Sequence, residues 1–435
     1  MNQQPDSPTE LLTSPEAYEK AGKNPPAATQ ASQIPAIQQR DSQIIESKRK
    51  SLEFLERELS LRGQISAEGP FDVNIKYKLS EIFRFFANRF QLRRRFSNIH
   101  FSPAINLCST LDEFLLPILE GHHLSPERKA IELKRLKELY AQWAREGRGY
   151  GGVYLPGQGI FVNGWLYGYN RPISPQGIWS DPALLPNLLH TTLHEALGHA
   201  LLAEYSALGC EKTSLRLQAL DYAVDFELRT VDDANRAVLN WKSNIVNLAS
   251  RYLEEGWATW AAGVFMPMFG RKPLYTDTLK SVWQTVESYA LPPADKTSIR
   301  DSLSKLFLEP TTDHDELSQA MRRLQKVGLD PNSGPGHGSE FPYMVGTLLV
   351  EQLELHLGIE LVPYAILIAA NVTYDLDKIS CTDLNSLVMN SAPFNPDCRL
   401  VLLSKLELPK PVTLSALAEA ARGQLNLAVP AELMT

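Results

Sequence analysis

The chain has 435 residues, of which 44% are hydrophobic and 21% charged, and its net charge is −7. This composition is typical of a globular protein with one large domain or a few smaller ones. The mild acidity argues against a general nucleic-acid-binding protein, which would need a basic surface. The four cysteines lie far apart and form no Cys-x-x-Cys pair, so we expect no disulfide framework and a reducing, cytoplasmic setting.

The start of the chain carries no predicted targeting or membrane segment. It has neither a basic beginning nor an apolar core, so a signal peptide is not expected. No apolar run reaches the ~18–20 residues that a transmembrane helix needs. Residues 1–44 are rich in Pro, Ser, Gln, Ala and Thr, and this composition predicts a disordered tail.

Residues 45–148 are predicted to form an N-terminal helical region. Its clearest helix spans residues 125–147, with Ser125 as the N-cap, Pro126 in the first turn and a glycine at the end. Residues 76–95 hold seven basic side chains against one acidic side chain. This stretch is predicted to be a helix with a solvated basic face, and a docking patch for an acidic protein partner is the alternative.

The pattern changes at residues 151–165. Two short β-prone runs, Val153–Leu155 and Ile160–Val162, flank the sequence Pro-Gly-Gln-Gly. This spacing predicts a hairpin. Helical patterns return after Asp181. The predicted fold class is therefore mainly α with a small β hairpin or sheet (α+β).

The ten residues HTTLHEALGH, from His190 to His199, suggest metal chemistry. A zinc ion takes about four nitrogen, sulfur or carboxylate ligands. His194 precedes Glu195 directly, and His199 follows five positions after His194. On a regular helix, residues five apart point about 140° away from each other and could not share a metal ion. A π-bulge at Ala196–Gly198 would align them, and such bulges concentrate at functional sites.

Two alternatives stay open for these histidines. His190 and His194 have the regular spacing of four, but Thr191 stands where the zinc-protease motif needs glutamate, so this pair ranks second. In the other alternative, all three histidines are hydrogen-bonded residues that bind no metal ion. The His-Glu pair followed by a second histidine favours the metal site.

A third ligand is expected from residues 251–265, RYLEEGWATWAAGVF, where Glu254 and Glu255 interrupt an apolar, aromatic helical pattern. Carboxylates in such surroundings are costly to bury unless they are paired or bound to a metal ion. Helical geometry places the two about 100° apart, so only one is expected to reach the site. The residues alone leave that choice open.

A further motif is GPGHGSEFPYMVG, residues 334–346, in which a glycine-rich loop is predicted to enter a helix at Pro342. Tyr343 then lies in the first turn, where its phenol could donate to the oxyanion that forms when water attacks a carbonyl. His337, in the loop, is a second candidate donor or substrate contact.

The series H-E-x-x-x-H, E-E-G-x-A and Y-x-x-G resembles the gluzincin-type zinc metallopeptidases with an enlarged histidine spacing. It is most similar to the tubulin tyrosine carboxypeptidases and their bacterial relatives with a Q-E-G-L-A motif, over roughly residues 150–360. The resemblance implies a zincin-like catalytic domain over residues 149–435 and one zinc ion per chain. It implies the ligands His194, His199 and Glu255, the general base Glu195, and Tyr343 as a donor to the transition state.

We therefore expect a zinc-dependent hydrolase that cleaves peptide bonds in a peptide or protein substrate, with a carboxypeptidase as one form of it. The edge strand of the hairpin is expected to pair with the substrate backbone, and Tyr154, Gln158 and Asn163 are candidates to line the cleft. The alternative is a non-catalytic metal-binding or protein-interaction protein that keeps the peptidase fold. No carboxylate receptor is predicted, although Arg171 and Lys272 are available.

Overall fold

The structure, a computed structural model, describes residues 28–58, 104–120, 125–146, 149, 151–169, 184–214, 233–266, 278–289, 291–329, 337–372 and 395–433. Most of these residues are helical, so the predicted mainly α class with a small β element is confirmed. The helices are α2 (Ala28–Glu58), α4 (Leu111–Glu120), α5 (Pro126–Arg145), α6 (Gly164–Gly168), α8 (Leu185–Leu193), η2 (His194–Ala200), α9 (Leu201–Tyr205), α11 (Asp233–Phe265), α12 (Leu279–Ser288), α13 (Pro293–Phe307), α14 (His314–Leu329), α15 (His337–Leu357), α16 (Val362–Ala369), α18 (Pro396–Leu403), α19 (Leu414–Gly423) and η6 (Ala431–Leu433).

The sheet has three strands, β1 (Ile105–Cys108), β2 (Gly152–Leu155) and β3 (Gly159–Asn163), in the order β1-β3-β2. Strands β2 and β3 form the predicted antiparallel hairpin, whose turn has positive φ at Gly157 (78°) and Gly159 (115°). Strand β1 pairs with β3 in parallel and was not predicted. Within the described residues, β2 is therefore an edge strand.

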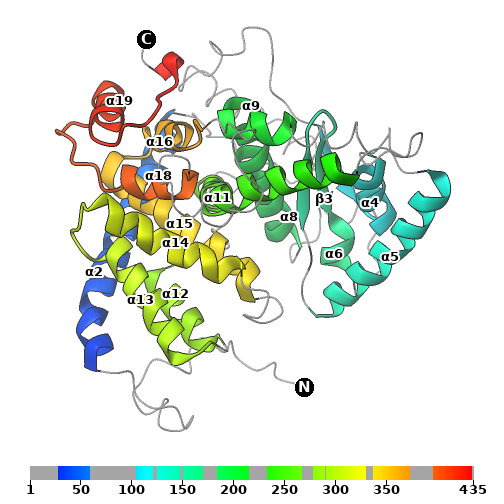
Figure 1. Cartoon of the computed structure of the whole chain (residues 1–435), viewed down its shortest axis with the longest axis horizontal. Helices are drawn as coiled ribbons and strands as arrows, with labels where there is room; N and C mark the ends of the chain where they lie inside the picture. Colours follow the sequence, from blue (N-terminus) through cyan, green and yellow to red (C-terminus); the bar gives the residue numbers. More distant parts are fainter. Residues whose placement is uncertain are drawn as a thin grey trace.

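Helix α5 agrees with the predicted helix at residues 125–147. The Ser125 hydroxyl accepts the Arg128 N–H at 3.3 Å, which is the expected N-cap contact. The helix ends at Arg145, and Tyr140 packs on Phe114 of α4 with 6.1 Å between ring centroids. Helices α4 and α5 lie beside the sheet, on the right of Figure 1.

Helices α11 and α15 cross in close contact at the middle of the molecule (Figure 1). A Cβ on Gly256 would lie 2.2 Å from the Gly346 carbonyl carbon, and a Cβ on Gly346 would lie 2.2 Å from the Tyr252 carbonyl oxygen. Only glycine permits this approach of two backbones. The crossing places the segment that carries Glu255 next to the segment that carries Tyr343.

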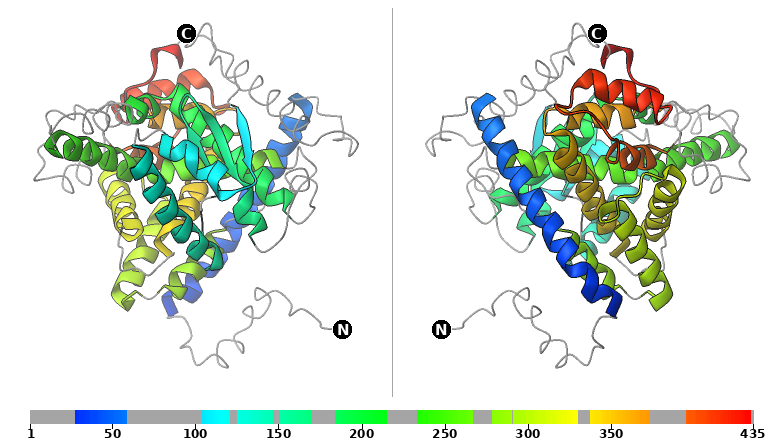
Figure 2. Two further views of the ribbon diagram at one scale, coloured as in Figure 1. Left: turned by 90° about the vertical axis from the view of Figure 1, so that its right-hand side faces the viewer. Right: turned by 90° about the vertical axis from the view of Figure 1, so that its left-hand side faces the viewer.

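Helix α2 runs diagonally along the outside of the C-terminal helices, as the right-hand view of Figure 2 shows. It begins at Ala28, inside the segment for which disorder is predicted, and residues 1–27 lie outside the described residues. Ile37 and Ile44 are each 5% exposed. Their burial against the neighbouring helices orders residues 28–44, although the polar composition of the segment suggests a disordered tail.

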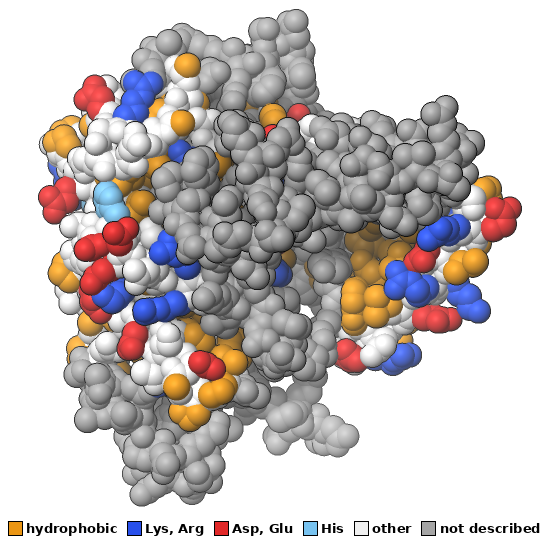
Figure 3. Space-filling view, viewed as in Figure 1, with side chains coloured by type: hydrophobic (Ala, Val, Ile, Leu, Met, Phe, Trp, Pro, Cys, Tyr) orange, Lys and Arg blue, Asp and Glu red, His pale blue; other side chains and the backbone are white. Residues whose placement is uncertain are grey.

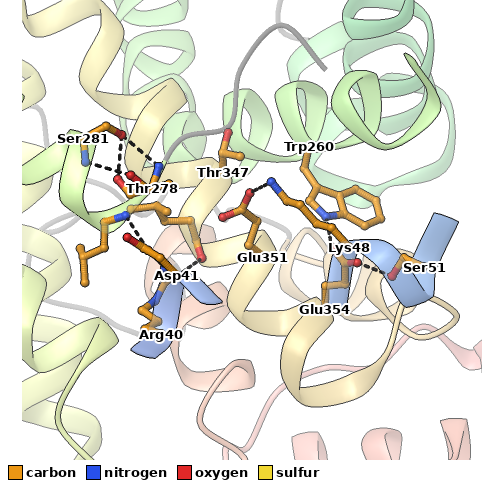
Figure 4. A network of polar contacts seen from close by, with 12 residues as sticks. Arg40, Asp41, Lys48, Ser51, Trp260, Thr278, Ser281, Thr347, Glu351 and Glu354 are labelled. Carbon is orange, nitrogen blue, oxygen red and sulfur yellow. Dashed lines mark hydrogen bonds and ion pairs between the residues drawn. The ribbon is translucent and has the colours of Figure 1, made fainter. Parts of the chain in front are cut away.

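Buried polar contacts fasten α2 to α15 (Figure 4). Lys48 forms an ion pair with Glu351, and the Ser51 hydroxyl donates to one carboxylate oxygen of Glu354. The other Glu354 oxygen accepts the Trp260 indole N–H at 2.7 Å. Glu351 and Glu354 are only 1% and 2% exposed, and each has a partner from the protein itself.

On the face shown in Figure 3, acidic and basic side chains of the described residues are interspersed over the helical body and α5. No helix in the described part of the chain combines the length and the apolarity needed to cross a bilayer. The basic stretch at 76–95, predicted as a helix or docking patch, lies outside the described residues.

Candidate metal centre

The H-E-x-x-x-H motif lies on the π-helix η2, which continues α8 and leads into α9. This widened turn confirms the predicted bulge. It brings the Nε2 atoms of His194 and His199 to 3.1 Å from each other. His190, the alternative ligand, stacks beside His194 at 6.2 Å between ring centroids, but the convergent group found among the described residues is His194, Glu195 and His199.

Two contacts with α11 favour the widened turn. A Cβ on Gly198 would lie 2.1 Å from the Ala258 Cβ, so only glycine fits at this position. The Trp257 indole N–H donates to the buried Leu197 carbonyl oxygen at 3.0 Å. A π-turn disturbs the regular pairing of backbone carbonyls, and an unpaired buried carbonyl is costly. The residues that follow Glu255 on α11 therefore hold the turn that carries the histidines.

Of the two acidic residues on α11, Glu255 faces the histidines. Its Oε2 lies 3.4 Å from the Nε2 atoms of both His194 and His199. The Glu254 carboxylate is instead bound by Lys212, whose Nζ lies 2.6 and 2.7 Å from its two oxygens. The geometry therefore resolves the choice that the residues left open, and it selects Glu255 as the candidate third ligand.

The three convergent atoms fit a zinc ion. They form a triangle with sides of 3.1, 3.4 and 3.4 Å. Zinc bonds of about 2.0–2.1 Å in a tetrahedron separate the ligand atoms by about 3.3–3.4 Å. The two imidazoles approach Glu255 Oε2 without hydrogen-bond geometry, and this buried oxygen has no hydrogen-bond partner among the described residues. A cation bound by the three atoms would satisfy that oxygen.

Glu195 lies directly against strand β2 and is 7% exposed. One of its oxygens lies within 4.8 Å of a ring nitrogen of each histidine. A Cβ on Gly152 would lie 2.8 Å from the Glu195 Cγ, so glycine is needed where the strand passes the carboxylate. The Tyr154 backbone also hydrogen-bonds to this carboxylate. Burial raises the pKa of Glu195 against the opposing effect of the histidines, and a raised pKa suits a proton acceptor.

Tyr343 completes the group. Its ring stacks on His194, with 5.8 Å between the centroids and 21° between the planes. Burial, followed by the Glu255 and Glu195 charges, raises the pKa of the Tyr343 phenol far above its ordinary value. The phenol therefore stays protonated and can donate a hydrogen bond. Helix α15 begins at His337 and not at Pro342, so Tyr343 lies beyond its first turn.

The charges at the centre are strongly coupled. Burial acts to lower the pKa of His199, but Glu255 outweighs it and raises this pKa to about 9. Burial acts to raise the pKa of Glu255, but His199 and His194 bring it well below the ordinary value. Burial, with a smaller effect of His194, lowers the pKa of His190 to about 3. Metal binding would replace the imidazolium–carboxylate attraction by coordination through neutral imidazoles.

The other residues predicted for the site have different positions. Tyr154 lies at the site, and its hydroxyl donates to Glu204 at 2.6 Å. Gln158 is exposed in the turn between β2 and β3. Asn163 is fully buried and its side chain caps the N-terminus of α6, so the structure gives it a capping contact and no place in a cleft. His337 is the first residue of α15, and its side chain is outside the described set.

Asp397 supports the site but carries no local sequence signal. Its Oδ1 accepts the Leu253 N–H at 2.7 Å, and its Oδ2 accepts the Gln325 amide at 2.7 Å. Burial raises the pKa of Asp397 to about 7. Because it binds the α11 backbone two residues before Glu255, Asp397 helps to fix the direction of that helix turn. Its helix, α18, is too distant in sequence for any motif to connect them.

Comparison of the chain with protein-family models, with curated proteins and with solved structures found no match. The geometry of the site and the motif pattern therefore indicate the function. Arg171 and Lys272, the basic residues considered as available carboxylate receptors, lie outside the described residues.

Proposed function

We propose that the chain is a zinc-dependent peptidase, with His194, His199 and Glu255 as ligands and Glu195 as the general base. The observation that carries the proposal is the triangle of ligand atoms, with sides of 3.1, 3.4 and 3.4 Å, which matches tetrahedral zinc. A second buried carboxylate beside the triangle supports hydrolysis, because a metal site that only binds an ion has no use for an extra base.

Different residues of the chain would carry out different steps of the hydrolysis. When bound, zinc would polarise the attacking water and the peptide carbonyl. Glu195 would take a proton as the water oxygen bonds to the carbonyl carbon. The Tyr343 phenol would donate to the carbonyl oxygen as that oxygen gains charge. The carbon–nitrogen bond then breaks, and Glu195 would return its proton to the leaving amine.

Strand β2 offers a surface for the substrate backbone. It is the edge strand of the sheet within the described residues, and it lies against the helix that carries Glu195. An extended peptide can add to such an edge through main-chain hydrogen bonds. Recognition through the main chain depends little on the substrate's side chains. The motifs of this chain therefore do not indicate which peptide sequence it prefers.

Metal analysis tests the ligand set. Purified protein should contain about one zinc ion per chain. Glu255→Ala should lose most of that zinc, because it removes a ligand. Glu254→Ala is the matched control and should retain zinc, because the Glu254 carboxylate binds Lys212. Zinc loss in Glu254→Ala with full occupancy in Glu255→Ala would contradict the assignment.

Peptide cleavage tests the activity. A mixture of short peptides, followed by mass spectrometry, should be hydrolysed by the zinc-loaded protein. Glu195→Gln should retain zinc and lose at least about 100-fold in rate, because general-base catalysis contributes on that order. Zinc-loaded protein that cleaves no peptide would instead favour the second function, a non-catalytic metal-binding or interaction protein that keeps the same ligand geometry.

A further inference from the structure

Arg251 occupies α11 one helical turn before Glu255. Residues four apart share a helix face, so Arg251 and the candidate ligand lie on the same side of α11. The Arg251 side chain is half-buried. Arg251 therefore lies one helical turn from the candidate ligand, on the same face of α11.

The neighbouring helix brings Tyr343 to the same stretch of α11. Gly346 lies against the Tyr252 carbonyl oxygen, and the rings of Tyr252 and Phe341 are 6.4 Å apart. Tyr343 lies between Phe341 and Gly346 on α15, so it also lies near residues 251 and 252 of α11. The Arg251 charge acts to lower the pKa of the Tyr343 phenol, which is consistent with the two groups being close.

Lys212 and Arg251, two basic residues that the structure describes in this region, differ in their partners. Lys212 is bound by the Glu254 carboxylate at 2.6 Å. Arg251 makes no hydrogen bond or ion pair with any other described residue. Its nitrogens are not among the buried side-chain atoms that lack a partner, so the guanidinium reaches solvent. Arg251 is thus a cation one helical turn from the candidate ligand, and no described side chain forms an ion pair with it.

We propose that Arg251 is the receptor for a carboxylate group of the substrate, which it binds next to Tyr343 and the metal centre. The inference rests on the proposed peptidase function and deepens it by naming a feature that the substrate must carry. The planar guanidinium matches a carboxylate through two parallel hydrogen bonds, which gives orientation as well as affinity. The carboxylate is either a free C-terminus or an Asp or Glu side chain near the cleaved bond.

Direct binding tests the receptor without requiring turnover. The full chain with Glu195→Gln, loaded with zinc, is titrated calorimetrically with short N-acetylated peptides of mixed neutral sequence. The peptides have three forms: a free C-terminal carboxylate, a C-terminal amide, and an amide with one added Asp. We expect at least one carboxylate form to bind about 10- to 150-fold more tightly than the neutral amide, as for hydrogen bonds to charged groups.

Replacing the guanidinium should abolish this preference. Arg251→Gln, in the same background, should bind all three forms like the neutral amide, while its zinc content and melting temperature stay unchanged. Arg251→Lys should recover part of the preference, because it retains the charge without the planar fork. Tighter binding of the free-carboxylate form assigns the C-terminus, and tighter binding of the Asp form assigns a side chain.

Arg322 on α14 provides the matched control. It is also half-buried and makes no ion pair with the described residues, but it lies near Cys398. Arg322→Gln should therefore leave peptide binding unchanged. Equal binding of all three forms by the chain that retains Arg251, or a carboxylate preference that survives Arg251→Gln, would overturn the inference. If the wild-type protein cleaves no peptide, the peptidase proposal fails, while the binding data still decide the role of Arg251.

Discussion

Buried carboxylates occur in two regions of the molecule, and their surroundings differ. Between α2 and α15, Glu351 is paired with Lys48, and Glu354 accepts hydrogen bonds from Ser51 and Trp260. At the metal centre, the Glu255 Oε2 atom lies 3.4 Å from the Nε2 atom of each of two histidines, His194 and His199.

This contrast separates a structural role from a binding role. Moving a carboxylate from water into the protein interior costs several kcal/mol at any buried position. Ion pairs and hydrogen bonds can compensate for this cost. Where the protein supplies those partners, as it does for Glu351 and Glu354, the cluster joins two helices. At Glu255, the partners are the imidazoles of His194 and His199, whose nitrogen atoms could also bind a metal ion together with the carboxylate. Four substitutions test this distinction.

A large loss of stability is expected from Lys48→Met, which leaves the Glu351 carboxylate buried without its ion-pair partner. We expect the free energy of unfolding to fall by about 3 kcal/mol, as for a broken buried pair. Zinc content should not change. Lys50→Met is the control on the same helix: Lys50 is 69% exposed and 3.6 Å from Glu46, so its loss should cost less than about 0.5 kcal/mol. Equal costs in a denaturant titration would contradict the contrast.

Gly198→Ala should affect both stability and metal binding. The added methyl group would overlap Ala258 and push η2 away from α11, at a cost of about 1–3 kcal/mol. The displaced turn should also weaken zinc binding. Gly263→Ala on α11 is the control, because no atom lies within 4 Å of its added Cβ, and we expect a gain of about 0.5–1 kcal/mol there. Full zinc affinity in Gly198→Ala would argue against a tightly held turn.

Trp257→Phe removes one hydrogen bond and retains an aromatic ring. The Leu197 carbonyl in η2 would lose its donor, at a cost of about 1–2 kcal/mol. Zinc affinity should fall about 10-fold, as for other residues that orient metal ligands. Trp260→Phe, which removes the hydrogen bond to Glu354, should reduce stability similarly without changing zinc affinity. A competition titration with a chelator measures the difference, and equal affinities of the two variants would contradict this role of Trp257.

The fourth effect concerns pH. Burial raises the pKa of Asp397 to about 7, whereas an unfolded aspartate titrates near about 3.9. The folded state therefore holds this proton more tightly, and the resulting stabilisation is complete below the unfolded pKa and lost as pH rises through about 7. Asp397→Asn cannot ionise, so its free energy of unfolding should decline less between about pH 4 and about pH 7. Identical pH slopes for both proteins would contradict this.

Local patterns predicted the parts of the structure that local geometry decides. The five-residue spacing of His194 and His199 is incompatible with a shared metal on a regular helix, and it led directly to the π-turn. The Ser125 cap and the glycine-rich turn likewise predicted α5 and the hairpin, because capping and turn formation involve neighbouring residues.

Features that depend on distant residues were not predictable. Selection of Glu255 over Glu254 depends on Lys212, which lies 42 positions from Glu254. Strand β1 pairs with residues more than 50 positions later, and no turn signal connects them. Arg251 is available to bind a substrate carboxylate because it has no ion-pair partner among the described residues. No sequence motif indicates whether a basic residue has such a partner. For Asn163, the local pattern led to a wrong position: the residue ends the hairpin, but its side chain caps helix α6.

The attachment of α2 to α15 limits how the chain can be shortened without loss of its fold. The motifs place the candidate catalytic machinery within residues 149–435, and that range looks self-contained in sequence. A chain shortened to it would expose the apolar surface that Ile37 and Ile44 cover and would remove both α2 partners of the α15 carboxylates. Helix α2 is therefore part of the folding unit that carries the metal centre, and a fragment that lacks it would lose these contacts.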